Sequence, residues 1–139
     1  MATPAELDEL INQHFMFEAT NDVDGVVGSL DQSFTHEVFP MTRGTVTDRG
    51  EVRDFYSWLF DNVNGTGVTP LKRYYGENFL IDETVWHGDV EDGAPLGCPG
   101  MSGPVSFRML HVFEVNEGKI TKEQVWCDLA ELQKQLSKK

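Results

Sequence analysis

Two long runs with strand character lie in residues 103–136, and this part of the sequence constrains the fold most strongly. The runs 105–115 and 119–127 flank the tripeptide Asn116-Glu117-Gly118. A glycine in such a loop can adopt the left-handed backbone conformation that a tight hairpin needs. We therefore predict two antiparallel strands joined by a three-residue loop.

The register of this hairpin identifies a candidate pair of titratable residues. If Val115 faces Lys119 across the loop, His111 faces Glu123 on the more apolar face, which is expected to point inward. Opposite residues of two antiparallel strands have Cβ atoms about 4.5–5.5 Å apart, so the two side chains could exchange a proton. A cross-strand ion pair at the wet end of the sheet is the alternative interpretation. The same register pairs Met109 with Val125, Phe107 with Cys127 and, on the outer face, Arg108 with Trp126 in a cation–π contact.

The remaining sequence alternates between helical and strand patterns. Thr3 and Glu6 form a capping box before a helix that runs to about Ala19. Further elements are predicted as a helix from Asp22, a strand over 34–39, a helix from Asp48 to Asn64-Gly65, strands over 68–75 and 79–87, and a short last helix capped by Asp128. Helices on one side of a mostly antiparallel sheet make an α+β fold, and 139 residues predict one domain, residues 1–139.

The charge and cysteine content narrow the classes of partner. With 23 acidic and 11 basic side chains the net charge is −12, which argues against nucleic acids and anionic membranes as partners. No secretory leader or membrane-spanning run is present in the sequence, so a cytoplasmic location is expected. Cys98 and Cys127 lack metal or redox spacing and are expected to be reduced. We predict no cofactor and no metal.

A family resemblance is carried by the same carboxy-terminal part. A loop with Gly97, Pro99 and Gly103 is followed by VSFRMLHVFEV, by GKI, and by Trp-x-Asp-Leu. This succession resembles the SnoaL-like polyketide cyclase family of the nuclear transport factor two-like superfamily, over about 88–136 and more weakly before. The resemblance implies a cone in which a curved sheet wraps around a long first helix, and a homodimer formed through the outer sheet face.

A cone of this kind leaves an apolar pocket for a small ligand between the first helix and the concave face of the sheet. Its lining is predicted to include Phe15, Trp58, Trp86, Phe107, Met109, Val125 and Cys127, although these side chains could instead fill the core. His36 is expected to point inward from its strand. The inward phase of 79–87 is open, with either Asp82, Thr84 and Trp86 or Glu83, Val85 and His87 facing in. His14 and Glu18 are expected at the surface or rim.

The sequence departs from the family at two places that matter for chemistry. The acid that the cyclases and the related limonene epoxide hydrolases use in the last strand corresponds here to Val125. Where the epoxide hydrolases carry an Arg and an Asp two residues apart, this sequence has Thr84 and Trp86. Epoxide hydrolysis, and cyclisation that uses that acid, are therefore not expected.

Two hypotheses for function remain. The first is a cofactor-independent acid–base enzyme of the isomerase, dehydratase or cyclase type that acts on a small apolar carbonyl or hydroxyl compound. His111 would be the general base or acid, Glu123 its orienting partner and His36 a second polar contact. The second is a non-catalytic ligand-binding or dimerisation module. The loop 89–104 is either a lid over the pocket or a plain surface loop.

Overall fold

The computed structural model describes residues 1–41 and 43–138. Its order of helices and strands confirms the order predicted from the sequence, with a short 3-10 helix (η1) and a short last strand added. The elements are α1 (Pro4–Ala19), α2 (Val23–Gly28), β1 (Leu30–Phe39), α3 (Arg49–Asn62), β2 (Val63–Gly76), β3 (Phe79–Val90), η1 (Ala94–Leu96), β4 (Met101–Asn116), β5 (Lys119–Cys127), α4 (Leu129–Gln135) and β6 (Ser137–Lys138).

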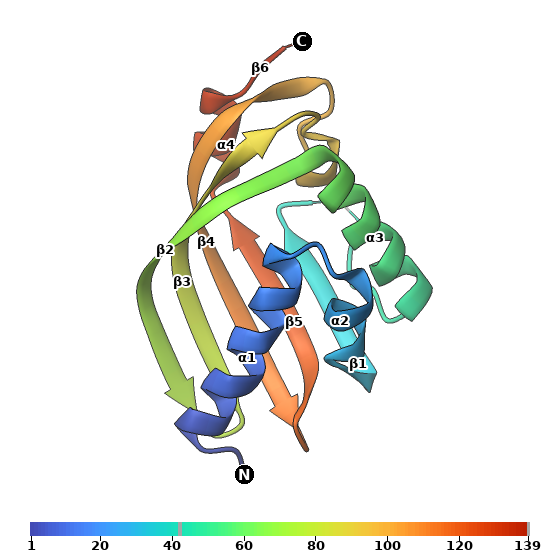
Figure 1. Ribbon diagram of the computed structural model, residues 1–139, viewed down its shortest axis with the longest axis vertical. Coiled ribbons are helices and arrows are strands. Elements are labelled where there is room, and N and C mark those ends of the chain that lie inside the picture. Colours follow the sequence, from blue (N-terminus) through green and yellow to red (C-terminus); the bar gives the residue numbers. More distant parts are fainter. Residues whose placement is uncertain (42, 139) are drawn as a thin grey trace.

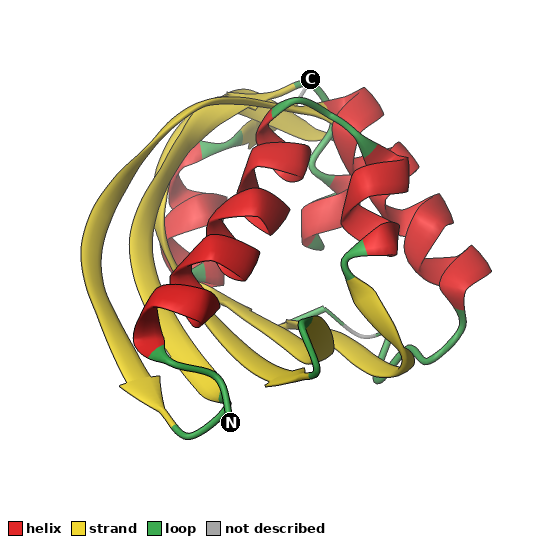
Figure 2. Ribbon diagram, turned by 60° about the horizontal axis from the view of Figure 1, so that its bottom comes forward, coloured by secondary structure: helices red, strands yellow, loops and turns green. Residues whose placement is uncertain are grey.

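The sheet has the strand order β1-β5-β4-β3-β2, and β6 pairs with β4 at one end. β1 runs parallel to β5, whereas the other neighbouring strands are antiparallel. The sheet curves around α1, and α2 and α3 cover the β1 side (Figures 1 and 2). The predicted α+β cone is therefore confirmed. Among the described residues, no helix combines the length and apolar character that crossing a membrane requires.

Helix α1 begins where its capping residues predict. The Thr3 hydroxyl accepts a hydrogen bond from the Glu6 backbone N–H at 3.2 Å, and a proline occupies the first helical position. Leu7 and Ile11 pack into the core. His14 has no exposed surface either, so the expectation that it lies at the surface or rim is wrong.

Two hydrophobic clusters stabilise the molecule. The larger one lies between the three first helices and the concave face of the sheet. The second lies under the far ends of β3 and β4, where Leu132 of α4 packs with Phe107. Leu96 and Cys98 from the 89–104 segment are buried in this second cluster. The segment is therefore packed into the body of the protein at these residues.

The β4–β5 hairpin differs from its predicted register. The loop has two residues, Glu117 and Gly118, both with positive φ (48° and 74°), as in the hairpin turns whose twist matches that of the strands. The register then shifts next to Val115, where one strand carries an extra residue. His111 consequently faces Val125, and Glu123 faces Phe113. The predicted pairing of His111 with Glu123 is wrong.

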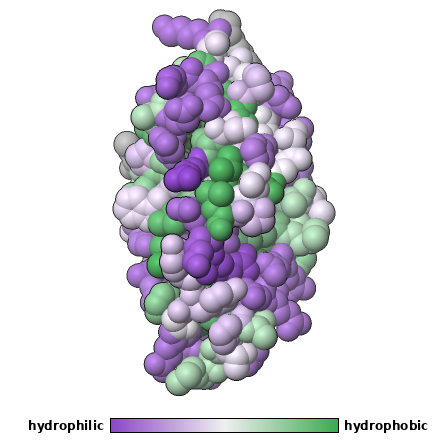
Figure 3. Space-filling model, turned by 90° about the vertical axis from the view of Figure 1, so that its left-hand side faces the viewer, coloured by the Kyte–Doolittle hydropathy of each residue, from purple (hydrophilic) through white to green (hydrophobic). Residues whose placement is uncertain are grey.

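The outer face of the sheet also differs from the prediction. Trp126 faces Leu110 and not Arg108, and its ring stacks on Phe39 with a centroid distance of 3.9 Å. The third helix ends at Asn62, and β2 begins immediately at Val63, earlier than the glycine suggested. β2 forms one edge of the sheet, and this side of the molecule is largely hydrophilic around a small apolar area (Figure 3).

Candidate active site

Glu123 of β5 is the centre of a buried polar network on the concave face. Its side chain has no exposed surface. One carboxylate oxygen, Oε1, accepts a hydrogen bond from the Tyr56 hydroxyl at 3.2 Å, and Oε2 lies 3.2 Å from His14 Nε2. A buried carboxylate without such partners would cost several kcal/mol (about 3–5). His14 of α1 and Tyr56 of α3 thus supply the polar contacts that the buried carboxylate of β5 requires.

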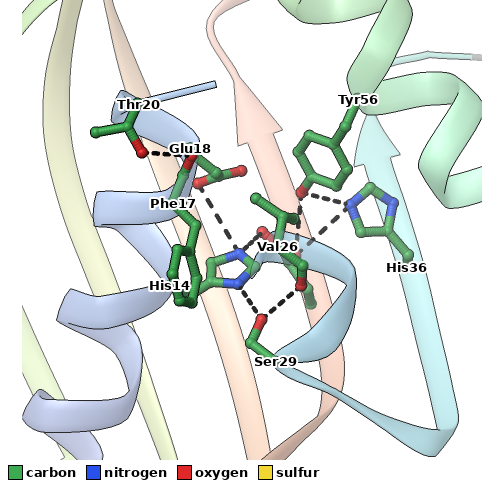
Figure 4. A network of polar contacts seen from close by, with 9 residues as sticks. His14, Phe17, Glu18, Thr20, Val26, Ser29, His36 and Tyr56 are labelled. Atoms are coloured by element: carbon green, nitrogen blue, oxygen red, sulfur yellow. Dashed lines mark hydrogen bonds and ion pairs between the residues drawn. The ribbon is translucent and has the colours of Figure 1, made fainter. Parts of the chain in front are cut away.

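The hydrogen bonds of His14 determine its protonation state. The Ser29 hydroxyl donates to the Val26 carbonyl at 2.6 Å, so Ser29 Oγ accepts the hydrogen bond from His14 Nδ1 at 2.7 Å. His14 Nε2 faces two carboxylates, Glu123 at 3.2 Å and Glu18 at 3.9 Å. Both ring nitrogens therefore act as donors, which requires an imidazolium. Figure 4 shows His14 held between Glu18 and Ser29.

His36 of β1 extends the network on the other side of Glu123. Because Tyr56 gives its only proton to Glu123, its oxygen accepts from His36 Nε2 at 3.0 Å. His36 Nδ1 then accepts from Arg43 Nη2 at 2.7 Å. His36 is therefore the neutral Nε2–H tautomer. A continuous path of polar groups runs from Glu18 through His14, Glu123, Tyr56 and His36 to Arg43. Figure 4 shows the part of the path between Glu18 and His36.

The electrostatics agree with these donor and acceptor assignments. Burial alone would lower the pKa of His14, but the nearby carboxylates of Glu123 and Glu18 raise it to about 9. Burial alone would raise the pKa of Glu123, whereas His14 lowers it to about 2. Burial lowers the pKa of His36 to about 4 against the opposing attraction of Glu123. Burial raises the pKa of Tyr56 far above its ordinary value.

Solvent reaches Glu18, which, like Arg43 at the other end of the path, differs in this from the buried centre of the network. Its side chain is 22% exposed, while those of His14 and Glu123 are fully buried. Burial and repulsion from Glu123 together outweigh attraction by His14 and raise the pKa of Glu18 to about 7. A carboxyl group that titrates near neutral pH can both accept and donate a proton there.

The other predicted polar residues lie next to this network. His111 is buried on the concave face of β4, and burial lowers its pKa. The carboxylate that faces it across the strands is Asp82 of β3. Asp82 and Thr84 are buried, which settles the inward phase of 79–87 in favour of Asp82, Thr84 and Trp86.

The predicted lining residues divide into three groups. Phe15, Met109 and Cys127 are half-buried on the concave side. Val125 and Phe107 are buried in the two clusters, and Trp86 packs on Phe107. Trp58 is 43% exposed and lines a separate groove of about 440 Å³ along the α3 side, with Arg43, Val46, Glu51, Asp54 and Phe55. The structure thus does not bring Trp58 together with the other six.

Sequence reasoning missed three members of the network around Glu123. Tyr56 stands among the apolar residues of its helix and its ring packs in the core, and Ser29 and Arg43 follow no recognisable spacing. The i,i+4 spacing of His14 and Glu18 was visible, and the inward phase of Ile11 one turn before His14 could have placed the imidazole in the core.

Within the described part of the chain, three residues of this network could hold a metal ion. The ligating atoms of His14, Glu18 and Glu123 lie within 4.8 Å of one another. His14 Nδ1 donates to Ser29, which leaves Nε2, between the two carboxylates, as the nitrogen that could ligate. Protons on His14 and Glu18 balance the charge of the cluster, so we interpret it as an acid–base centre.

Comparisons with known proteins agree with the fold. The sequence profile of the SnoaL-like domain matches residues 11–123, whereas a comparison with curated proteins gives no match. Similar solved structures include an LEH-like epoxide hydrolase from M. tuberculosis, with a TM-score of 0.72, 15% identity, and coverage of 94% of this chain and 88% of that chain. A proposed isomerase from Bacillus subtilis has a TM-score of 0.79 and 15% identity, covering 97% of this chain and 95% of the other. A proposed SnoaL-like polyketide cyclase from Shewanella putrefaciens has a TM-score of 0.78 and 14% identity, covering 96% and 97%. At such low identity these likenesses establish the fold alone.

Proposed function

The chain belongs to the SnoaL-like domain family, which supports a small-molecule isomerase or cyclase type of role in general, and from this premise we propose that it is an acid–base enzyme. Its substrate would be a small, mostly apolar carbonyl or hydroxyl compound bound on the concave face. The observation that carries the proposal is the path of polar groups centred on the fully buried Glu123.

The proposed roles follow from which groups solvent can reach. Glu18 is the partly exposed acidic end of the path, so it is the proposed general base or acid at the substrate. His14 and Glu123 act through Glu18 as positioning residues, because they set its charge and can relay its proton. His36 orients Tyr56 from the other side. His111 is the second proposed polar contact to substrate, with Asp82 facing it in place of Glu123.

A ligand-binding module without catalysis is the competing function. A structural ion pair would also bury Glu123 with His14, so the pair alone does not decide between the two. The argument for catalysis is that Glu18, a carboxyl group titrating near neutral pH, stands at the solvent-reached end of the pair.

The test uses a step that isomerases, dehydratases and cyclases acting on carbonyl compounds share, which is removal of a proton from the carbon next to the carbonyl. Cyclohexanone, acetophenone and 2-cyclohexenone are incubated with the protein in D₂O, and deuterium incorporation is followed by NMR. We expect exchange with the wild type that Glu18→Gln and Glu123→Gln reduce about 100-fold or more. Glu9→Gln removes an exposed carboxylate from the same helix and should exchange like the wild type. No exchange above buffer, or equal exchange by Glu18→Gln and wild type, would favour the binding module.

We also propose that two copies pair through the outer face of the sheet. Trp126 is 45% exposed there and stacks on Phe39, which gives an apolar anchor at the β1 edge. Sedimentation of the wild type should give a dimer, and Trp126→Glu should sediment as a monomer because a charge would be buried in the interface. Glu83→Lys on the same face further from the anchor is the control. If the wild type sediments as a monomer at about 100 µM, the proposed dimer is excluded.

A further inference from the structure

Two buried polar atoms on the concave face have no hydrogen-bond partner among the described residues, and they belong to neighbouring side chains. They are Asp82 Oδ2 and His111 Nδ1. The two residues face each other in the β3–β4 ladder and are 5% and 6% exposed. Leaving a buried polar atom unpaired costs about 1–3 kcal/mol. One further group that satisfied both atoms would remove this cost.

Neither side chain can turn to find a partner elsewhere. Arg73 Nε donates to Asp82 Oδ1 at 2.9 Å, and Arg73 Nη1 is itself tied to Asp8 of α1 at 2.8 Å. The His111 ring stacks on Phe113 and meets Phe15 edge-on at a centroid distance of 5.0 Å. The carboxylate and the imidazole are therefore fixed in orientation before any ligand arrives.

We infer that Asp82 and His111 together bind a hydroxyl group of an apolar ligand. A hydroxyl can donate to Asp82 Oδ2 while its oxygen accepts a hydrogen bond from His111 Nδ1 in the tautomer that carries a proton there. An anion would be repelled by the Asp82 carboxylate. A cation would meet Arg73 on the other side of that carboxylate and the imidazolium of His14 nearby.

The surroundings fit the apolar part of such a ligand. Met109 lies two residues from His111 on the same face, and Thr84 beside Asp82 faces Met109 across the strands. Phe15 and Met109 pack against the core and are half-buried, so part of each side chain is accessible to solvent. An aromatic or alicyclic alcohol could rest on them while its hydroxyl meets the two polar atoms.

This inference names the substrate class of the proposed enzyme, and it rests on the proposed function only in calling the bound alcohol a substrate. Binding is measured without turnover and depends on Asp82 and His111. The exchange assay depends on Glu18 and Glu123. Either result can therefore fail while the other stands.

Phenol and toluene are matched probes because they differ chiefly in a hydroxyl and a methyl group. Backbone amide NMR shifts of 107–113 are followed while each probe is added to the wild type, Asp82→Leu, His111→Phe and the control Glu83→Gln, whose side chain is outside the inward set. We expect phenol to bind the wild type and Glu83→Gln about tenfold or more tightly than toluene, because a site built for a hydroxyl rejects the analogue that lacks it. Both Asp82→Leu and His111→Phe should lose that preference, so either one suffices if the other does not fold.

Three outcomes would overturn the inference. One is equal affinity of the wild type for phenol and toluene. Another is a phenol preference that survives in His111→Phe and Asp82→Leu. The third is a water proton that shows a persistent NOE to the His111 ring while phenol leaves the 107–113 shifts unchanged, since a bound water would then fill the place permanently.

Discussion

His14 Nε2 and Glu123 Oε2 are 3.2 Å apart although 109 positions separate the two residues, and both side chains are completely buried. The contact joins the middle of α1 to β5 across the concave face. Removing one member of a buried ion pair leaves an uncompensated charge, whereas removing both can be nearly neutral. The pair therefore couples the position of α1 on the sheet to the charge of the site.

Glu123→Gln should lower the free energy of unfolding by about 3–5 kcal/mol at pH 7, because the His14 imidazolium loses its buried counter-ion. Urea unfolding followed by circular dichroism measures the change. Glu83→Gln on β3, two strands from β5, should stay within about 0.5 kcal/mol of the wild type. A Glu123→Gln protein as stable as that control would mean that the pair contributes no net stability.

Stability should fall as the pH rises from 7 to 9. The folded pKa of His14 is about 9, above its ordinary 6.5, so its contribution is fully present below pH 6.5 and is lost as the pH rises through 9. The pKa of Glu18 is raised from 4.5 to about 7, so its contribution to stability is likewise lost as the pH rises, here between 4.5 and 7. The pKa of His36 is lowered from 6.5 to about 4, so its contribution to stability changes in the opposite direction and is lost as the pH falls through 4. The effects of Glu18 and His36 oppose each other between pH 4.5 and 6.5, so the fall above pH 7 isolates His14.

The variant that checks this assignment is His14→Gln, measured with the wild type at pH 7 and pH 9. Its free energy of unfolding should be lower at pH 7 and should change less between the two values. An unchanged slope in His14→Gln would assign the fall to other groups. Below pH 4.5 the wild type should lose stability because His14 lowers the pKa of Glu123 to about 2, and His14→Gln should lose less because that partner is gone.

Arg43→Met should raise the pKa of His36 from about 4 toward its ordinary 6.5. The guanidinium donates to Nδ1 at 2.7 Å and so opposes protonation of that nitrogen, although burial contributes more to the shift. NMR of the ring nitrogens reports both the pKa and the tautomer, which should be Nε2–H in the wild type. Arg53→Met removes an exposed cation from α3 and should leave His36 unchanged. A pKa in Arg43→Met equal to that of the wild type would contradict the donor assignment.

Local chemistry explains which parts of the fold were predictable. The hydroxyl of Thr3 and the carboxylates of Asp48 and Asp128 cap three helices in the way the sequence indicated, because a cap involves residues only three positions apart. Alternation of apolar residues likewise located the strands of the hairpin. These signals extend over a few residues and need no tertiary contact.

Register and site depend on contacts that such signals do not contain. The sequence does not show whether Asn116 belongs to the loop or ends the strand. In the structure Asn116 ends the strand, and this shorter loop, together with the extra residue next to Val115, changes every pair of the hairpin. His111 therefore faces Val125 and not Glu123. Tyr56 reaches Glu123 across 67 positions and was visible only as one apolar member of a helical stripe. The Tyr56 ring packs in the apolar core while its hydroxyl donates to Glu123, and the periodic pattern indicates only the position of the ring.

Two glycines of α2 should respond to alanine in opposite directions. A Cβ at Gly25 would collide with the Phe17 ring and approach the Asp22 carboxylate that caps the helix, whereas a Cβ at Gly28 meets nothing within 4 Å. Gly25→Ala should therefore destabilise the protein by about 1–3 kcal/mol through overpacking, and Gly28→Ala should stabilise it by up to about 1 kcal/mol by reducing the entropy of the unfolded chain. Because Phe17 precedes Glu18 on α1, Gly25→Ala should also move the NMR signals of His14, and Gly28→Ala should leave them in place. Urea unfolding and the imidazole spectrum of each variant test both halves, and equal stability of the two variants would show that α2 moves freely enough on α1 to absorb the methyl group.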